Sequence, residues 1–161
     1  MDLKNRRIAI IGAGIADEET YNLAYRIGKL LGERGAIIYT GGLGGVMEGA
    51  SRGAYEAGAL TVGILPGNKA EEANPYVRVP VVTNMGEGRN VILVRCAEVV
   101  VAISGGYGTL SEIALALKMW KPVIALKTWE NIPGVIYVDS PEEVLAKVLE
   151  SFGIFNLTYK S

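Results

Sequence analysis

The chain has 161 residues, with 16 basic and 17 acidic side chains, one cysteine and no histidine. Catalytic units that need imidazole, zinc sites of the usual His/Cys types and a disulfide within the chain are therefore excluded. The near-zero net charge gives no basis for binding nucleic acid or a membrane surface, and the length predicts a single domain over residues 1–161.

Short apolar runs alternate with helical patterns along the whole chain. The runs are continuous, which is typical of strands buried on both faces of a parallel sheet. The first run ends at Gly12, too early for a signal peptide, and none reaches transmembrane length, so we expect a cytoplasmic protein. The predicted strands are 8–11, 36–39, 60–65, 99–103, 123–126 and 135–138, with 80–82 as a weaker candidate.

Helix signals lie between these runs. Acids follow Asp17, which favours a helix start there, and Gly35 marks its end. Ser140-Pro141-Glu142-Glu143 combines a capping box with proline at the first helical position. Further helices are predicted over about 46–57, from Arg89 and after Gly108. This alternation predicts an α/β fold, a single Rossmann-like doubly wound parallel sheet of about 6–7 strands with helices on both faces.

Many of the 21 glycines directly follow a predicted strand. In a parallel sheet such turns share the carboxyl edge, where open α/β sheets bind ligands. Glycine lets backbone amides approach an anion, and helix starts add partial positive charge. The arrangement favours a phosphate-bearing ligand over a purely structural role. The candidate binding residues are Gly12, Gly14, Gly41, Gly42, Gly44, Gly45, Gly105, Gly106, Gly108 and Thr109.

Two common nucleotide motifs are incomplete. The Gly28-Lys29 pair lies inside a predicted helix, so no Walker A loop is present. The first glycine turn, Gly12 to Asp17, lacks the third glycine of the dinucleotide fingerprint, and Tyr39-Thr40 stands where that fold places an acid. These departures argue against a nicotinamide cofactor, and we expect neither a cofactor nor a metal.

The segment from Ser104 to Glu112 carries the most specific pattern, Ser-Gly-Gly-Tyr-Gly-Thr-Leu-Ser-Glu. Its glycine backbone and the Thr109 hydroxyl can receive a phosphate at the start of a helix. Thr109 and Glu112 also have the spacing of a capping box, which needs no ligand. From this local pattern alone the cap is the favoured interpretation, and the phosphate site stays open as the alternative.

This segment resembles the Pro-Gly-Gly-x-Gly-Thr-x-x-Glu motif of the LONELY GUY family, nucleoside 5′-monophosphate phosphoribohydrolases long labelled lysine decarboxylases. Residues 40–49 are similar to the family's second glycine loop, which adds Met47 to the ligand-binding candidates. The resemblance implies that Arg89 and Glu112 are catalytic. Asn74-Pro75-Tyr76 and Gly88-Arg89-Asn90 resemble a sister branch, the DprA/Smf-related and molybdenum-cofactor-carrier-like proteins.

The chain departs from the family around Arg89. The family's Met-His-x-Arg-Lys motif reads Gly86-Glu87-Gly88-Arg89-Asn90 here, so its histidine and lysine are absent, and Ser104 and Ser111 replace a proline and a glutamate. The phosphate cradle is thus kept better than the catalytic residues. A cation at a helix start is unfavourable, so Arg89 predicts an anionic partner nearby.

Two functions remain open at this point. In the first, the protein hydrolyses the N-glycosidic bond of a nucleoside monophosphate, with Glu112 stabilising an oxocarbenium-like transition state and Arg89 holding the phosphate or ribose. In the second, it binds a nucleotide or the molybdenum cofactor without turnover. The DNA-processing relatives raise nucleic-acid binding, against which the net charge of −1 counts. Relatives of this type are homodimers or larger. Met119, Trp120 and residues 152–155 offer apolar surface for such contacts, with ordinary core packing as the alternative.

Overall fold

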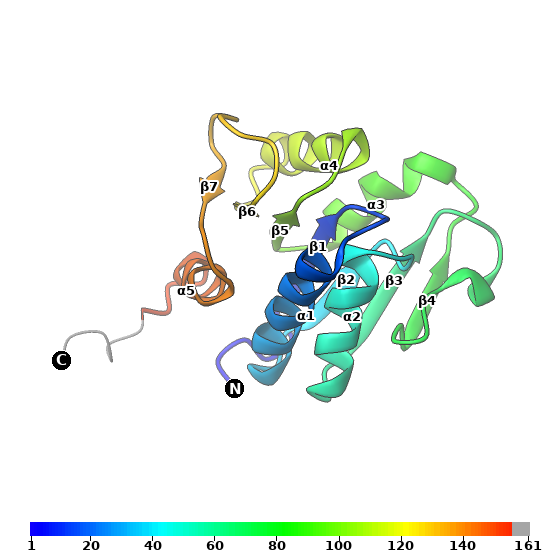
Figure 1. Cartoon of the computed structure of the whole chain (residues 1–161), viewed down its shortest axis with the longest axis horizontal. Helices are drawn as coiled ribbons and strands as arrows, with labels where there is room; N and C mark the ends of the chain where they lie inside the picture. The colour runs from blue at the N-terminus through cyan, green and yellow to red at the C-terminus, as the bar shows by residue number, and fades with distance from the viewer. Residues whose placement is uncertain (156–161) are drawn as a thin grey trace.

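The computed structural model describes residues 1–155 and contains one sheet of seven strands in the order β4-β3-β2-β1-β5-β6-β7 (Figure 1). Every neighbouring pair is parallel. The predicted α/β Rossmann-like fold is therefore confirmed. The strands are β1 (Arg7–Gly12), β2 (Ile37–Thr40), β3 (Thr61–Leu65), β4 (Val79–Val82), β5 (Val99–Ile103), β6 (Val123–Leu126) and β7 (Ile136–Tyr137).

Four α-helices lie between these strands and a fifth follows β7, and the first and last helices start at the predicted caps. The Asp17 side chain accepts a 2.8 Å hydrogen bond from the Thr20 amide, and Ser140 Oγ accepts one of 3.2 Å from the Glu143 amide. None of the helices in residues 1–155 is long and apolar enough to cross a membrane. The helices are α1 (Glu18–Glu33), α2 (Val46–Glu56), α3 (Arg89–Cys96), α4 (Tyr107–Lys118) and α5 (Pro141–Ser151), with 3-10 turns η1 (Ala70–Glu72) and η2 (Gly86–Gly88).

The sheet is buried on both faces because alternate strand residues enter different cores. On β1, Ile8 and Ile10 join the core that α1, α2 and α5 cover, while Ala9 and Ile11 join the core that α3 and α4 cover. All four side chains are at most 2 % exposed. This double burial explains why the strands read as continuous apolar runs.

The weak strand candidate at residues 80–82 is confirmed as β4, an edge strand. Pro80 lies opposite Gly63 of β3. Proline has no N–H group to donate, so a sheet edge is where it costs least. The strand's exposed burial pattern agrees with this position and explains its weak sequence signal.

The order of the strands reverses at β1. From β1 the chain builds outward through β2, β3 and β4, and it then returns to place β5 on the other side of β1. The connections after β1 and β5 therefore lead to opposite faces of the sheet, which opens a crevice at their carboxyl ends.

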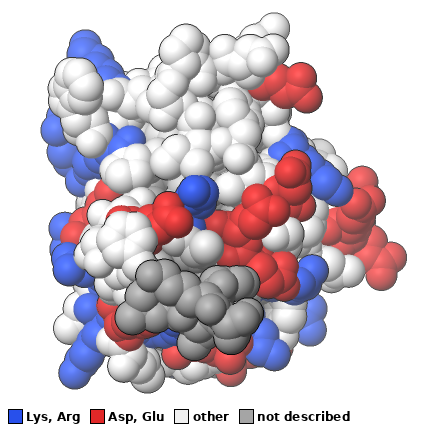
Figure 2. All heavy atoms as spheres, turned by 90° about the vertical axis from the view of Figure 1, so that its left-hand side faces the viewer, with Lys and Arg blue, Asp and Glu red and all other residues white. Residues whose placement is uncertain are grey.

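The spare apolar surface expected near the end of α4 and near the C-terminus is present in part. Trp120, which follows the helix, is 94 % exposed, and Phe155 is 66 % exposed. Met119, Phe152 and Ile154 instead pack partly against the two cores. On the side of the molecule that carries α5, basic and acidic side chains are interspersed (Figure 2).

Candidate functional site

A cavity of about 170 Å³ opens in the crevice at the carboxyl edge of the sheet. The turns after β1, β2 and β5 and the starts of α2, α3 and α4 contribute to its wall. The predicted site residues that line it are Gly12, Gly14, Gly41, Met47, Arg89, Gly106, Gly108, Thr109 and Glu112. Gly42, Gly44, Gly45 and Gly105 lie in the same turns but do not line the cavity.

Arg89 is the cation of this cavity. Its guanidinium lies close to the second glycine turn, since a Cβ at Gly41 would fall 2.7 Å from both Arg89 Nη2 and Met47 Sδ. Arg89 Nη1 donates to Asn90 Oδ1. Among the side-chain atoms of residues 1–155, Arg89 Nε is the one buried polar atom without a hydrogen-bond partner. Burial lowers the pKa of Arg89, and the charge of Glu112 opposes that shift.

Glu112 supplies the acidic side chain of the cavity. It projects from α4 and is only 6 % exposed. Burial raises the pKa of Glu112 to about 7, although the charge of Arg89 lowers it. Among the described residues, neither Glu112 nor Arg89 takes part in an ion pair. This carboxyl group therefore titrates near neutral pH, where it can act as a charged or as a neutral group.

The capping-box interpretation of Thr109 and Glu112 is wrong. Helix α4 begins at Tyr107 rather than after Gly108, and its N-cap, Gly106, makes no side-chain capping bond. The turn before the helix also approaches Thr109 closely: a Cβ at Gly105 would lie 2.0 Å from Thr109 Oγ1, and the φ of Gly105 is +103°. Glycine alone fits at position 105. Because α4 begins at Tyr107, Thr109 lies within the first helical turn and does not cap it.

The helix starts around the cavity share a second feature. The N-caps of α2, α3 and α4 are glycines without a side-chain capping bond, whereas Asp17 and Ser140 cap α1 and α5. The first N–H groups of an uncapped helix need an acceptor, and the helix dipole favours an anion there. The starts of α2 and α4 border the cavity in this way, whereas α3 continues from η2, whose carbonyl groups already accept the Arg89 N–H. Two helix starts at one cavity make this edge of the sheet suited to an anionic ligand.

Two asparagines hold the site together, and the sequence alone gave them no such role. Asn74 Nδ2 donates to the carbonyl oxygens of Leu43 (2.9 Å) and Gly42 (3.3 Å), which fixes the second glycine turn. Asn90 accepts from Arg89 and lies 3.5 Å from Ser111 Oγ through its Nδ2. Both are buried, at 9 % and 7 % exposure. In the sequence, the two asparagines stood out only because Asn74-Pro75-Tyr76 and Gly88-Arg89-Asn90 resemble the sister branch. The spacing of these residues did not indicate a role for either asparagine.

Sequence comparison assigns the family. The pattern of the SLOG cluster4 family matches residues 5–151. The chain belongs to the SLOG cluster4 family. An uncharacterized protein of Archaeoglobus fulgidus is 44% identical over 149 residues, which are 92% of this chain and 98% of that protein. The cytokinin riboside 5′-monophosphate phosphoribohydrolase LOG of Oryza sativa subsp. japonica is 32% identical over 114 residues, 67% of this chain but only 47% of the rice protein.

Two solved structures are similar to this SLOG cluster4 chain over most of its length. The molybdenum cofactor binding protein of Rippkaea orientalis is 36% identical with a TM-score of 0.85, covering 93% of this chain and 98% of that one. The molybdenum cofactor carrier protein of Chlamydomonas reinhardtii is 33% identical, also with a TM-score of 0.85, covering 93% and 99%. Together these relatives confirm the resemblance to the LONELY GUY family and to the molybdenum-cofactor-carrier branch.

One further structure shares the fold alone. DNA processing protein A of Helicobacter pylori, whose structure describes single-stranded DNA binding, is 17% identical with a TM-score of 0.71, covering 91% of this chain and 81% of that one. At that identity the likeness carries no argument about DNA.

Proposed function

We propose that the protein binds a nucleoside 5′-monophosphate or a similar phosphorylated ligand in the cavity at the carboxyl edge. The observation that carries this proposal is Arg89, a buried cation whose Nε has no partner within the described residues. Arg89 also lines the cavity and takes part in no ion pair among the described residues, so a phosphate oxygen there would give its guanidinium a charge-assisted hydrogen bond.

The rest of the cavity supports the same ligand. The uncapped start of α4 offers backbone amides at Gly106, Gly108 and Thr109, and the dipole of the helix adds partial positive charge. An arginine and a helix start then receive the phosphate from two sides. The similar rice enzyme acts on a riboside 5′-monophosphate, and the two similar structures are a binding protein and a carrier protein of the molybdenum cofactor, which supports a small ligand at this site.

Calorimetric titration with a panel of nucleoside monophosphates and with ribose 5-phosphate tests the binding. We expect saturable binding in the micromolar to millimolar range that weakens when Arg89 is replaced by methionine. Wild-type protein that binds none of these compounds, nor inorganic phosphate, would contradict the proposal.

Hydrolysis of the N-glycosidic bond is the second candidate function, and Glu112 is the observation that favours it. In this reaction a water oxygen bonds to the anomeric carbon, the carbon–nitrogen bond breaks, and the base leaves with a proton. A carboxylate beside the anomeric carbon stabilises the positive charge of the transition state and accepts the proton of the attacking water. Glu112 lies in the same cavity as Arg89, where it could play this part.

Chromatography that detects free base distinguishes hydrolysis of the ligand from binding without hydrolysis. If the protein is an enzyme, base and ribose 5-phosphate accumulate with the wild type and not with Glu112→Gln, and the rate rises with pH to a plateau above about 7 as Glu112 ionises. Binding without release of base, in wild type and variant alike, would leave a carrier of nucleotides or of the molybdenum cofactor as the function.

We also propose that a second copy of the chain covers the sheet face that bears α3 and α4. More partly buried apolar side chains adjoin this core than the opposite one, among them Met119 and Leu115, and Trp120 and Val91 are exposed near it. Sedimentation of the wild type should give at least a dimer, and Trp120→Ser should shift it toward monomer. A monomeric wild type at micromolar concentration would contradict the dimer.

A further inference from the structure

The cavity is smaller than the ligand proposed for it. Pockets that enclose a whole small-molecule ligand measure roughly 300–1,000 Å³, whereas this cavity measures about 170 Å³. If Arg89, Glu112 and the glycine turns hold the phosphate and the sugar, the remaining part of the ligand must extend beyond the mouth. The surface around that mouth therefore decides what the remaining part can be.

Two large exposed side chains are direct chain neighbours of residues that line the cavity. Tyr107 is 82 % exposed, and the residues on either side of it, Gly106 and Gly108, both line the cavity. Ile15 is 94 % exposed and follows Gly14, which lines the cavity from the turn after β1. Strands β1 and β5 are neighbours, so the two side chains extend from adjacent turns. Exposed apolar side chains at the rim of a polar site are typical of a surface that a ligand covers.

Tyr107 is held in place from behind. Its ring packs against Trp129, with ring centroids 5.7 Å apart and an interplanar angle of 34°. Trp129 Nε1 donates a 3.0 Å hydrogen bond to the carbonyl oxygen of Gly106, and Thr128 Oγ1 donates one of 2.6 Å to that of Ser104. The loop between β6 and β7 thus fixes the turn that carries Tyr107. One side of the tyrosine ring is supported by the indole, and most of the ring remains open to solvent.

We propose that Tyr107 is the stacking surface for the planar heterocycle of the ligand, with Trp129 positioning it. This inference rests on the proposed function, because it takes the phosphate of the ligand to lie in the cavity. A supported aromatic face binds planar rings of several kinds, since every such ring has a π-face. The subsite therefore selects phosphorylated compounds that carry a nucleobase or a pterin over sugar phosphates that carry no ring.

Titration calorimetry with matched ligands tests the subsite. Adenosine 5′-monophosphate and 6-hydroxymethylpterin phosphate carry a ring and a phosphate, whereas ribose 5-phosphate lacks the ring. We expect Tyr107→Ala to weaken binding of a ring-bearing compound about tenfold and to leave ribose 5-phosphate unchanged. Tyr107→Phe should bind like the wild type, and Phe155→Ala, which removes an exposed aromatic far along the chain, serves as the matched control.

The outcomes separate this inference from the function on which it rests. Equal losses for all ligands in Tyr107→Ala, or no loss for any, would overturn the stacking role while leaving the phosphate site standing. Wild-type protein that binds ribose 5-phosphate as tightly as every ring-bearing compound would do the same. Wild-type protein that binds none of the phosphates would overturn the proposed function and this inference with it. A loss confined to the nucleotide or to the pterin supports stacking and identifies the ring.

Discussion

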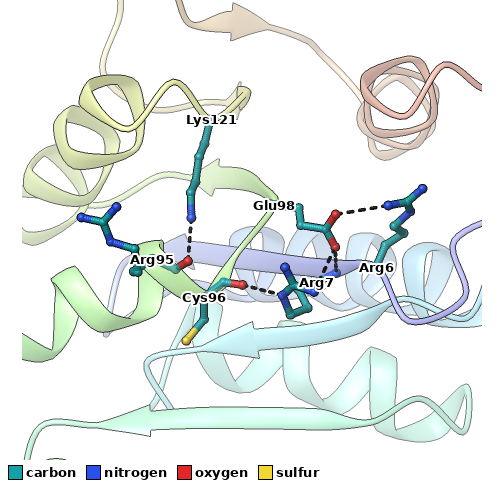
Figure 3. Close-up of polar contacts among 6 residues, drawn as sticks. All are labelled: Arg6, Arg7, Arg95, Cys96, Glu98 and Lys121. Atoms are coloured by element: carbon teal, nitrogen blue, oxygen red, sulfur yellow. Dashed lines mark hydrogen bonds and ion pairs between the residues drawn. The ribbon is translucent and has the colours of Figure 1, made fainter.

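The two edges of the sheet differ in whether their cationic side chains have hydrogen-bond partners within the protein. At the amino edge, Arg7 Nε donates a 2.9 Å hydrogen bond to the carbonyl oxygen of Cys96, and Lys121 Nζ donates one of 2.7 Å to that of Arg95 (Figure 3). Lys121 Nζ also donates a 2.7 Å hydrogen bond to the carbonyl oxygen of Val94. Both side chains thereby bind carbonyl groups in the last turn of α3, of which that of Val94 also accepts from the Ala97 amide. At the carboxyl edge, Arg89 at the start of that same helix has a buried Nε without a partner.

Their acidic neighbours differ in the same way. Glu98 lies 3.3 Å from Arg6 and 3.5 Å from Arg7, with its side chain 25% exposed (Figure 3). Glu112 is more deeply buried and takes part in no ion pair among the described residues. The amino edge satisfies its own charges and serves stability, whereas the carboxyl edge leaves groups unsatisfied that a ligand can complete. Variants of matched residues at the two edges should therefore change different properties.

The largest effect is expected from the two arginines. Arg89→Met should weaken binding of a nucleoside monophosphate about 100-fold, because it removes charge-assisted hydrogen bonds to the phosphate. Arg7→Met should leave the affinity unchanged and lower the free energy of unfolding by about 1 kcal/mol, because the Cys96 carbonyl loses its donor. Calorimetry and urea unfolding of both variants measure the contrast. An equal loss of affinity in the two would show that the edges do not differ.

The next effect concerns Glu112 and the pH dependence of stability. The folded carboxyl holds its proton up to about pH 7, whereas the unfolded one releases it near 4.5. Between these pH values the folded state binds more protons, so its stability falls as the pH rises through this window. Glu112→Gln should remove that slope and raise the free energy of unfolding at pH 8 by about 2 kcal/mol.

Urea unfolding at pH 5 and pH 8 provides the measurement, with Glu98→Gln as the matched variant. Glu98 is paired with two arginines at the amino edge, so its replacement should lower stability at pH 8 by less than about 1 kcal/mol. The two glutamates should thus give changes of opposite sign. A loss of stability at pH 8 in Glu112→Gln would contradict this prediction, because it would mean that the folded protein stabilises the ionised carboxylate of Glu112.

A smaller effect is expected at Lys121, the second cation of the amino edge. Burial lowers its pKa, and Arg95 adds to that shift, yet the two hydrogen bonds to α3 keep the side chain in place. Lys121→Met should lower the free energy of unfolding by about 1 kcal/mol, because two carbonyl groups lose a charged donor while the side-chain stem is kept. Ligand affinity should not change, and a tenfold loss would show that the two edges are coupled through α3.

The sequence predicted the elements of the fold well because each one is specified locally. The runs of β1 and β5 are apolar because both faces are buried, and the caps at Asp17 and Ser140 are formed by neighbouring residues. Even the edge strand with Pro80 was detectable. These local features determine the order of strands and helices. In a parallel sheet that order is enough to bring the glycine turns to one edge.

The site was less predictable where its geometry depends on contacts between distant segments. The predicted start of α4 was wrong because the helix begins at Tyr107 after a glycine N-cap without a side-chain capping bond, which no capping rule indicates. The hydrogen bond from Asn74 Nδ2 to the Gly42 carbonyl joins residues that are 32 positions apart in the sequence. The burial of Glu112 and the unpartnered Nε of Arg89 likewise arise only when α3 and α4 come together at the crevice. The roles of these residues in binding or catalysis stay predictions that the variants above address.

The smallest effect should come from Gly108, and it separates stability from binding at a single position. Gly108 lies in the first turn of α4 and lines the cavity, and a Cβ added there would meet no protein atom within 4 Å. Because glycine is a poor helix residue, Gly108→Ala should raise the free energy of unfolding by about 0.5 kcal/mol. The added methyl group narrows the space at the start of the helix, so affinity for the phosphate should fall about threefold. A variant that gains stability and keeps full affinity would place the ligand away from this turn, and one that loses stability would show that the glycine is needed by the fold itself.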